Sequence, residues 1–171
     1  MPRAASGCGP AKPRWRWSAW AISIFVETHS AEETRSLGAR LASSLEAGDV
    51  IALDGDLGSG KTELVKGIAQ GLGVTGNVHS PTFVLHHHYP GPIPLEHYDL
   101  YRLEGASWID AGLDEPSPDT IAVIEWPARA APLEAWATIQ IELAVTGETA
   151  RRLALRRGPD RVRRIFDAAG D

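Results

Sequence analysis

The segment that most constrains the fold of this chain is the glycine-rich stretch Gly-Asp-Leu-Gly-Ser-Gly-Lys-Thr at residues 55–62. Its spacing is that of a phosphate-binding loop, in which glycines allow tight turns that aim backbone N–H groups at phosphate oxygens. In such a loop Lys61 reaches the β- and γ-phosphates, and the Thr62 hydroxyl takes one position on Mg²⁺. We therefore predict a nucleotide-binding loop made of Gly55, Asp56, Leu57, Gly58, Ser59, Gly60, Lys61 and Thr62.

The residues on either side of this motif support the prediction. Residues 49–54 form a short apolar run typical of a buried strand. Residues 63–72 carry apolar side chains at helical spacing, and Gly73 is suited to end that helix. Strand, loop and helix follow in the order that points the helix N-terminus at the phosphates. The alternative, a glycine-rich turn without a ligand, is disfavoured by this order.

Strand and helix patterns continue along the rest of the chain. Ser30 and Glu33 form a capping-box pattern that opens a helix ending before Gly48. Further strands are expected at 22–26, up to Tyr89, and at 95–103, 120–124, 138–145 and 152–156, with helices within 106–118 and at 160–168. Near-continuous apolar strands beside helices indicate an α/β protein. We predict a P-loop NTPase-like fold with a largely parallel central sheet flanked by helices and an added C-terminal β-hairpin.

Composition limits the class of protein further. Residues 21–171 are expected to form a single domain behind a disordered basic extension, residues 1–20. The lone cysteine, Cys8, excludes a disulfide framework, and no apolar run is long enough to span a membrane, so a cytoplasmic protein is expected. Residues 21–150 hold six basic and nineteen acidic residues, so this acidic body is not expected to bind RNA without a partner.

Two acidic residues stand where predicted strands end. Glu125 follows the apolar run 121–124, and Asp99 follows the alternating segment 95–98. Strand-end loops carry ligands in open α/β sheets, and a nucleotide hydrolase needs acids there to hold Mg²⁺ or orient water. We therefore predict functional roles for Glu125 and Asp99, the alternative being solvated acids or salt-bridge partners.

Three other segments are ambiguous. Ser80-Pro81-Thr82 could place a hydroxyl near the γ-phosphate as switch segments do, or could be a simple turn before a strand, and the pattern favours neither. Residues 86–88 are three consecutive histidines, for which a solvated or core-edge strand is favoured over a metal site, because only two can share a strand face. The seven arginines within 151–164 could be a phosphate lid, an electrostatic contact or a solvated face.

Taken together, these motifs resemble the TsaE (YjeE) family of P-loop ATPases from bacterial tRNA threonylcarbamoyladenosine synthesis. The resemblance runs from about Ser30 to Pro127. It rests on Glu33-Thr34 with Leu37-Gly38, the glycine loop, Ser80-Pro-Thr-Phe, Tyr98-Asp-Leu-Tyr-Arg-Leu, Gly112-Leu-Asp-Glu and Ile124-Glu-Trp-Pro. Glu63 departs from the family pattern, which has a small or hydroxyl residue after the loop, and the N-terminal extension also lies outside it.

The resemblance implies an Mg²⁺-dependent ATPase that is slow without partner proteins. It implies that Lys61 serves phosphate, that Thr62 and Glu125 serve Mg²⁺ and that Asp99 is needed for hydrolysis. Ser80 and Thr82 would belong to a switch-like segment, with Trp126 close to the nucleotide. The implied partners are the TsaD and TsaB homologues, with tRNA met only through that complex. ATP hydrolysis would reset the complex between turnovers and would not transfer the threonylcarbamoyl group.

Three other functions share the loop. A small-molecule kinase needs its own substrate clamp, for which only the C-terminal arginines are available. A GTPase usually selects guanine with Asn-Lys-x-Asp, whereas the only asparagine, Asn77, is followed by valine. A non-hydrolysing nucleotide-binding adaptor would keep working after mutation of Asp99, which an ATPase subunit would not.

Overall fold

The computed structural model describes residues 24–103, 108, 111–130 and 136–170. Its elements follow one another along the chain as β1 (Ile24–Thr28), α1 (Ala31–Ala42), β2 (Val50–Asp54), α2 (Lys61–Gly71), β3 (His86–Tyr89), β4 (Leu95–Asp99), β5 (Ile121–Glu125), η1 (Pro127–Arg129), β6 (Ile139–Val145), β7 (Arg151–Arg157) and α4 (Asp160–Gly170). The predicted extension at residues 1–20 lies outside the described residues.

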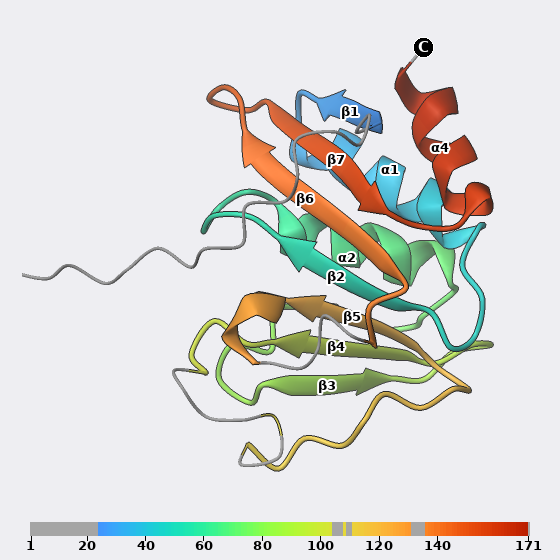
Figure 1. Ribbon diagram of the computed structural model, residues 1–171, viewed down its shortest axis with the longest axis vertical. Coiled ribbons are helices and arrows are strands. Elements are labelled where there is room, and N and C mark those ends of the chain that lie inside the picture. The colour runs from blue at the N-terminus through green and yellow to red at the C-terminus, as the bar shows by residue number, and fades with distance from the viewer. Residues whose placement is uncertain (1–23, 104–107, 109–110, 131–135, 171) are drawn as a thin grey trace, which may run out of the picture.

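The strands form one mixed sheet whose centre is parallel. The order is β1-β7-β6-β2-β5-β4-β3, as Figure 1 shows from top to bottom. Strands β6, β2, β5 and β4 run parallel to one another, whereas β7 returns antiparallel to β6 and pairs antiparallel with β1. Strand β3 is antiparallel to β4 at the other edge. The predicted parallel sheet with an added C-terminal hairpin is therefore confirmed, with β6 serving as both the last parallel strand and the first arm of the hairpin.

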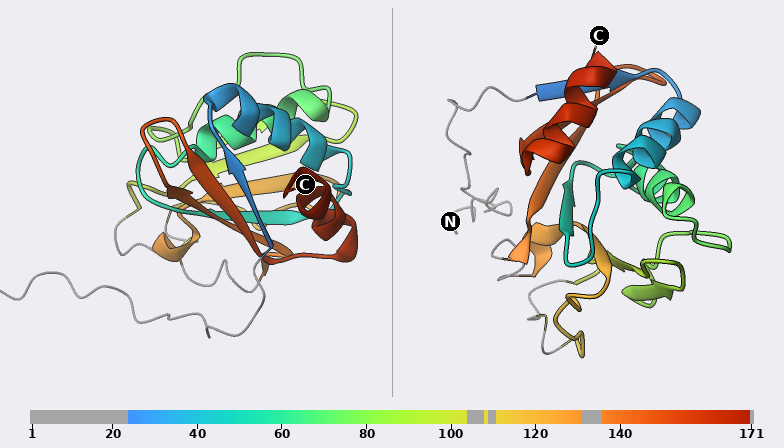
Figure 2. Two further views of the ribbon diagram at one scale, coloured as in Figure 1. Left: turned by 90° about the horizontal axis from the view of Figure 1, so that it is seen from above. Right: turned by 90° about the vertical axis from the view of Figure 1, so that its right-hand side faces the viewer.

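The main core lies between the sheet and helices α1, α2 and α4. It contains buried leucines, isoleucines and valines from β2, β5 and β6, together with Phe166 of α4. Helices α1 and α2 lie side by side on this side of the sheet in both views of Figure 2. Glycines allow them to approach closely, because a Cβ at Gly67 would lie 2.0 Å from the Arg35 carbonyl oxygen and one at Gly38 would lie 2.4 Å from the Leu64 carbonyl oxygen. The close packing fixes α2, and with it the loop from which α2 starts.

A second, smaller cluster covers the other face of the sheet. Tyr98 and Ile124 pack there with Trp108 and with residues of the segments that follow β4 and η1. Burial on both faces explains why β4 and β5 are buried along their whole length. It is the arrangement expected from their near-continuous apolar sequences.

Some predicted boundaries differ from the structure. Helix α1 ends at Ala42, well before Gly48, because the hydroxyls of Ser43 and Ser44 bond to the Arg40 and Leu41 carbonyls and satisfy the helix end. Strand β4 ends at Asp99, earlier than predicted. The predicted helix within 106–118 lies partly outside the described residues, and 111–118 contain turns and irregular backbone. Within the described segments, no helix is long and apolar enough to cross a membrane.

Candidate nucleotide-binding site

A cleft of about 390 Å³ opens where β2, β4 and β5 end and α2 begins. Parallel strands bring their carboxyl ends to one edge of the sheet, which is where open α/β proteins bind ligands. The cleft is lined by Leu57, Gly58, Gly60, Lys61, Thr62, Glu63, Ser80, Thr82, Asp99, Tyr101, Glu125 and Trp126. Residues from the glycine loop, from the 80–82 segment and from two strand ends therefore share one cavity.

At three positions the loop from residue 55 to 60 has a backbone conformation that only glycine adopts readily. Gly55, Gly58 and Gly60 have φ values of +141°, +78° and +100°. Gly55 is also closely packed, because a Cβ there would lie 2.3 Å from the Leu143 carbonyl oxygen. The tight turn is closed by a bond from the Ser59 N–H to the Asp56 carbonyl at 3.1 Å. The positions of the three glycines are thus explained by local geometry.

Lys61 is buried beneath the loop, with 4% of its surface exposed. Its Nζ donates to the carbonyls of Gly55 at 2.8 Å and Asp56 at 3.0 Å, and lies 4.0 Å from the centre of the Trp126 ring. Burial lowers the pKa of Lys61, opposed chiefly by the nearby Glu125 carboxylate. The ammonium is held by neutral carbonyls and an aromatic face, groups that it can exchange for phosphate oxygens without separating an ion pair.

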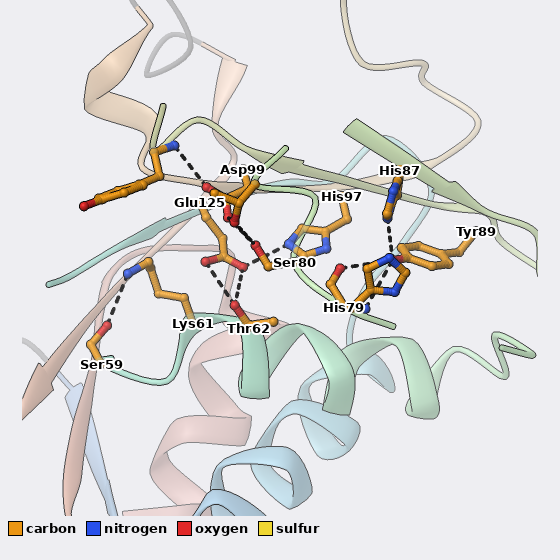
Figure 3. Close-up of polar contacts among 12 residues, drawn as sticks. Ser59, Lys61, Thr62, His79, Ser80, His87, Tyr89, His97, Asp99 and Glu125 are labelled. Carbon is orange, nitrogen blue, oxygen red and sulfur yellow. Dashed lines mark hydrogen bonds and ion pairs between the residues drawn. The ribbon is translucent and has the colours of Figure 1, made fainter. Parts of the chain in front are cut away.

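Glu125, at the end of β5, is held by two side chains. The Thr62 hydroxyl at the start of α2 donates to its Oε1 at 3.0 Å, and His97 Nε2 lies 3.0 Å from the same oxygen. Figure 3 shows the side chains of Thr62 and His97 both pointing toward the Glu125 carboxylate. The glutamate and the histidine are both almost fully buried, with side-chain exposures of 3% and 0%.

Asp99, at the end of β4, is paired in register with Glu125 on β5 but has a different set of partners. Its Oδ2 accepts from the hydroxyls of Ser80 and of Thr82, the latter at 2.7 Å, and its Oδ1 accepts from the Tyr101 N–H at 3.0 Å. The two hydroxyl oxygens also lie 2.6 Å apart. Since each hydroxyl has one proton, only two of these three close side-chain contacts are hydrogen bonds at any time.

The oxygen-only character of these groups fits Mg²⁺. A hydroxyl and a carboxylate lie within hydrogen-bond distance at Thr62 and Glu125, and Mg²⁺ prefers such ligands with phosphates and waters completing its shell. Across the described residues, no group of three or more His, Cys, Asp or Glu side chains is arranged to hold a metal by itself. The donor set therefore suits an ion that arrives with a phosphate ligand.

Trp126 adopts a left-handed backbone conformation, φ +61°, directly after Glu125. Its backbone N–H donates to the Leu53 carbonyl at 3.2 Å, and its indole ring packs on the Tyr101 ring with centroids 5.1 Å apart. This turn places the indole over Lys61. Trp126 therefore borders the cleft beside Lys61, and its proximity to a bound nucleotide stays a prediction.

Of the other predicted candidates, the histidines of β3 and the C-terminal arginines lie outside the cleft. His86 and His88 share a strand face, as expected, and both contact Glu96 of β4. Glu63 borders the cleft, but its carboxylate pairs with Lys66 at 2.7 Å. None of residues 151–164, all of which are described, lines the cleft.

The C-terminal arginines lie on β7 and α4. Arg152 pairs with Glu27 at 2.8 Å, Arg161 pairs with Asp49 at 2.7 Å, and Arg156 pairs with Glu142. Arg151 donates to carbonyls of its own turn. These contacts favour the interpretation of the arginines as a solvated face of the protein over their interpretation as a lid that clamps phosphates.

Two residues at the site, His97 and Tyr101, were not predicted from the sequence. The signal for His97 was its position two residues before Asp99, which places both side chains on the same face of β4. Tyr101, two residues after Asp99, lines the cleft beside Trp126.

A glycine loop between a parallel strand and a helix, with a buried lysine and two strand-end carboxylates, defines a P-loop nucleotide-binding protein. The family model described as "Threonylcarbamoyl adenosine biosynthesis protein TsaE" matches residues 28–153. The chain belongs to this family.

Individual relatives agree with this assignment. The chain is 49% identical over 98 residues to the tRNA threonylcarbamoyladenosine biosynthesis protein TsaE of Streptomyces coelicolor, covering 54% of this chain and 66% of the relative. With the relative of that name from Treponema pallidum it is 38% identical over 130 residues, which is 75% of this chain and 96% of the relative. The matches thus span just under two thirds of the Streptomyces and Bacillus subtilis relatives, at 66% and 63% of their lengths.

A solved structure supports the same fold. The crystal structure of YdiB from Bacillus subtilis is similar to this chain with a TM-score of 0.64 at 28% sequence identity, covering 86% of this chain and 93% of YdiB. The likeness includes the mixed sheet with its parallel centre, so the predicted fold class and the resemblance to the TsaE family are both confirmed.

Proposed function

We propose that this chain is the ATP-binding and ATP-hydrolysing subunit required for threonylcarbamoyladenosine modification of tRNA beside the anticodon. It acts in the cytoplasm with TsaD and TsaB homologues, meets tRNA only through their complex and resets that complex between turnovers. The observation that carries the proposal is that Lys61, Thr62, Asp99 and Glu125 line a single cleft in a member of the TsaE family.

The residues divide the work of hydrolysis between them. Lys61 exchanges its carbonyl partners for phosphate oxygens, while the loop N–H groups bind the remaining oxygens. Thr62 and Glu125 would hold Mg²⁺, which would supply positive charge to neutralise the charge that develops on the phosphates. Asp99 orients the attacking water, and Ser80 and Thr82 hold Asp99 in place. Trp126 packs over Lys61 and shields it from solvent.

The experiment that tests this proposal is ATP hydrolysis by the purified chain, alone and with the TsaD and TsaB homologues of the same organism. We expect slow turnover alone and a clear increase with the partners, accompanied by repeated rounds of tRNA modification. Phosphate transfer to a small molecule, without any response to the partners, would instead establish a kinase.

The substitution Lys61→Ala should abolish nucleotide binding, because it removes the phosphate-facing cation of the loop. A loss of about 100-fold or more in ATP affinity is expected from removing a charged hydrogen bond in a buried site. Isothermal titration with ATP measures it. Lys66→Ala is the matched control, because Lys66 lies on the same helix but pairs with Glu63. Unchanged ATP affinity in Lys61→Ala would refute the assignment of the loop.

A further inference from the structure

A buried histidine contacts the carboxylate to which the proposed function gives the metal-side role. The imidazole of His97 is completely buried, and its Nε2 lies 3.0 Å from Glu125 Oε1. The Cα of His97 is in register with that of Val123, so its side chain reaches toward the end of β5 to meet Glu125. Neither the glycine-loop motif nor the catalytic roles proposed above make use of this residue.

Of the two ring nitrogens of His97, Nε2 makes the contact with Glu125. An ionised carboxylate only accepts hydrogen bonds, so Nε2 carries the proton in this contact. The other ring nitrogen, Nδ1, is buried and has no hydrogen-bond partner among the residues that the structure describes. Burying an unsatisfied polar atom costs free energy, and an apolar side chain of similar shape would avoid that cost. The imidazole is therefore poorly explained as packing, and the contact that it does make is with Glu125.

That contact determines how Glu125 presents its two oxygens. Oε1 receives both the His97 contact and the shorter of the two Thr62 contacts, 3.0 Å as against 3.4 Å to Oε2. His97 comes from β4, which is paired on both sides, and Thr62 comes from the first turn of α2, so the carboxylate is held from two rigid elements. Hydrogen bonds to a metal-ligating carboxylate fix its orientation and commonly change metal affinity by about 10- to 100-fold when removed.

We infer that His97 is a positioning residue that orients the Glu125 carboxylate, with Thr62, for Mg²⁺ bound together with the nucleotide. The inference rests on the proposed metal-side role of Glu125. It does not require that hydrolysis be fast, or that hydrolysis occur at all, because positioning affects the binding of Mg²⁺ with nucleotide before any chemical step.

The test compares three substitutions by the ratio of ATP affinities with and without Mg²⁺. In His97→Gln the longer amide can still donate near the position of Nε2, whereas in His97→Asn the amide is too far from Glu125 and in His97→Phe no donor remains. We expect the Gln variant to keep the Mg²⁺ enhancement within about threefold of the unmodified chain. In the Asn and Phe variants this ratio of ATP affinities with and without Mg²⁺ should fall by about tenfold or more, while the ATP affinity without Mg²⁺ stays unchanged. His87→Phe, on strand β3 outside the cleft, is the control and should behave as the unmodified chain does.

A double substitution tests whether His97 acts through Glu125. If it does, His97→Phe combined with Glu125→Ala should reduce Mg²⁺ enhancement no further than Glu125→Ala does alone. If the double variant lost more Mg²⁺ enhancement than Glu125→Ala alone, the inference would be overturned. It would also be overturned if the Gln, Asn and Phe variants lost equal amounts of Mg²⁺ enhancement and their unfolding temperatures and Mg²⁺-free ATP affinities fell in parallel. Absence of any Mg²⁺ enhancement in the unmodified chain would also overturn it. By contrast, Mg²⁺-enhanced binding without hydrolysis or response to partners would refute the proposed function and leave the His97 comparison interpretable.

Discussion

The cleft holds two carboxylates on neighbouring strands whose partners come from different kinds of structure. Glu125 is held by Thr62 on α2 and His97 on β4, both of which belong to regular elements packed in the main core. Asp99 is held by Ser80 and Thr82, which precede β3 in a segment without regular secondary structure. The two acids are paired in register, so the difference lies in their partners and not in their depth in the sheet.

This difference matches two kinds of task. A carboxylate held by a helix and a strand keeps its position whether or not a ligand is bound, which suits a metal site. A carboxylate held by loop hydroxyls changes its surroundings when the loop moves, which suits a step that depends on nucleotide state. The 80–85 segment is tied to β4 by a backbone bond from the Asp99 N–H to the carbonyl of Leu85, whose φ is +66°. A shift of Ser80 and Thr82 would therefore change the hydrogen bonds and the position of the Asp99 carboxylate.

The largest effect should follow from breaking the rigid side of this comparison. We expect Glu125→Ala to reduce Mg²⁺-dependent ATP turnover by roughly 100-fold or more, the scale seen when a preorganised charge-stabilising group is removed. Much of the ATP binding should remain, because Lys61 and the loop N–H groups are untouched. Steady-state phosphate release and Mg²⁺-free ATP titration measure the two quantities.

The same substitution should also cost stability. It leaves the buried Nε2–H of His97 without its acceptor, a loss worth about 1–3 kcal/mol. Glu125→Gln is the control, because the amide oxygen can still accept from His97 while the charge is lost. Full activity in Glu125→Ala would reassign this residue to a structural role.

Much of this arrangement could be predicted from the sequence because the glycine loop fixes its own surroundings. Gly55–Thr62 requires a strand before it and a helix after it, so β2 and α2 followed from the motif and from apolar periodicity. The strand-end positions of Asp99 and Glu125 also followed from short apolar runs. The contact of His97 with Glu125 could not be predicted in this way, because the two residues are 28 positions apart and their proximity depends on which strands pair. The sequence predicted only that α1 ends before Gly48, because serine hydroxyls that bond to the last carbonyls leave no periodic signal from which to find its last residue.

A smaller effect should follow from breaking the loop side. Thr82→Val removes the hydroxyl that donates to Asp99 at 2.7 Å while keeping the size of the side chain. Ser80 still donates to the same oxygen, so we expect only about a 5- to 10-fold loss of turnover, equivalent to one hydrogen bond of about 1 kcal/mol. ATP affinity should not change, because Lys61 and the loop N–H groups are untouched. The unfolding temperature should not change either, because Thr82 is half-buried in a loop and Asp99 still accepts from Ser80. Thr82→Ser, which restores the hydroxyl, should recover turnover; failure to do so would mean that the methyl group matters and the hydrogen bond does not.

The smallest effect should come from a third strand-end carboxylate, Asp54 of β2, which does not line the cleft. Burial raises the pKa of Asp54, opposed first by the hydrogen bond that its Oδ1 accepts from the Gly55 N–H at 2.9 Å. Since the pKa is higher in the folded state than in the unfolded state, the folded chain binds the proton more readily, and the ionised carboxylate reduces stability at every pH above the folded pKa. Asp54→Asn keeps an acceptor for Gly55 and removes that cost.

We therefore expect Asp54→Asn to raise the unfolding temperature at neutral pH by about 2 °C. The gain should shrink as pH falls through the raised pKa of Asp54 toward the ordinary value of 3.8, because the unmodified chain then becomes protonated as well. The substitution also removes an attraction to Lys61, but Asp54 does not line the cleft, so ATP affinity should change by less than about threefold. Thermal unfolding of both chains from neutral pH down to about pH 4 measures the difference. If the gain in unfolding temperature stayed constant with pH, it would come from packing and not from the charge. If Asp54→Asn lost as much turnover as Glu125→Ala, Asp54 would belong with the two carboxylates of the cleft.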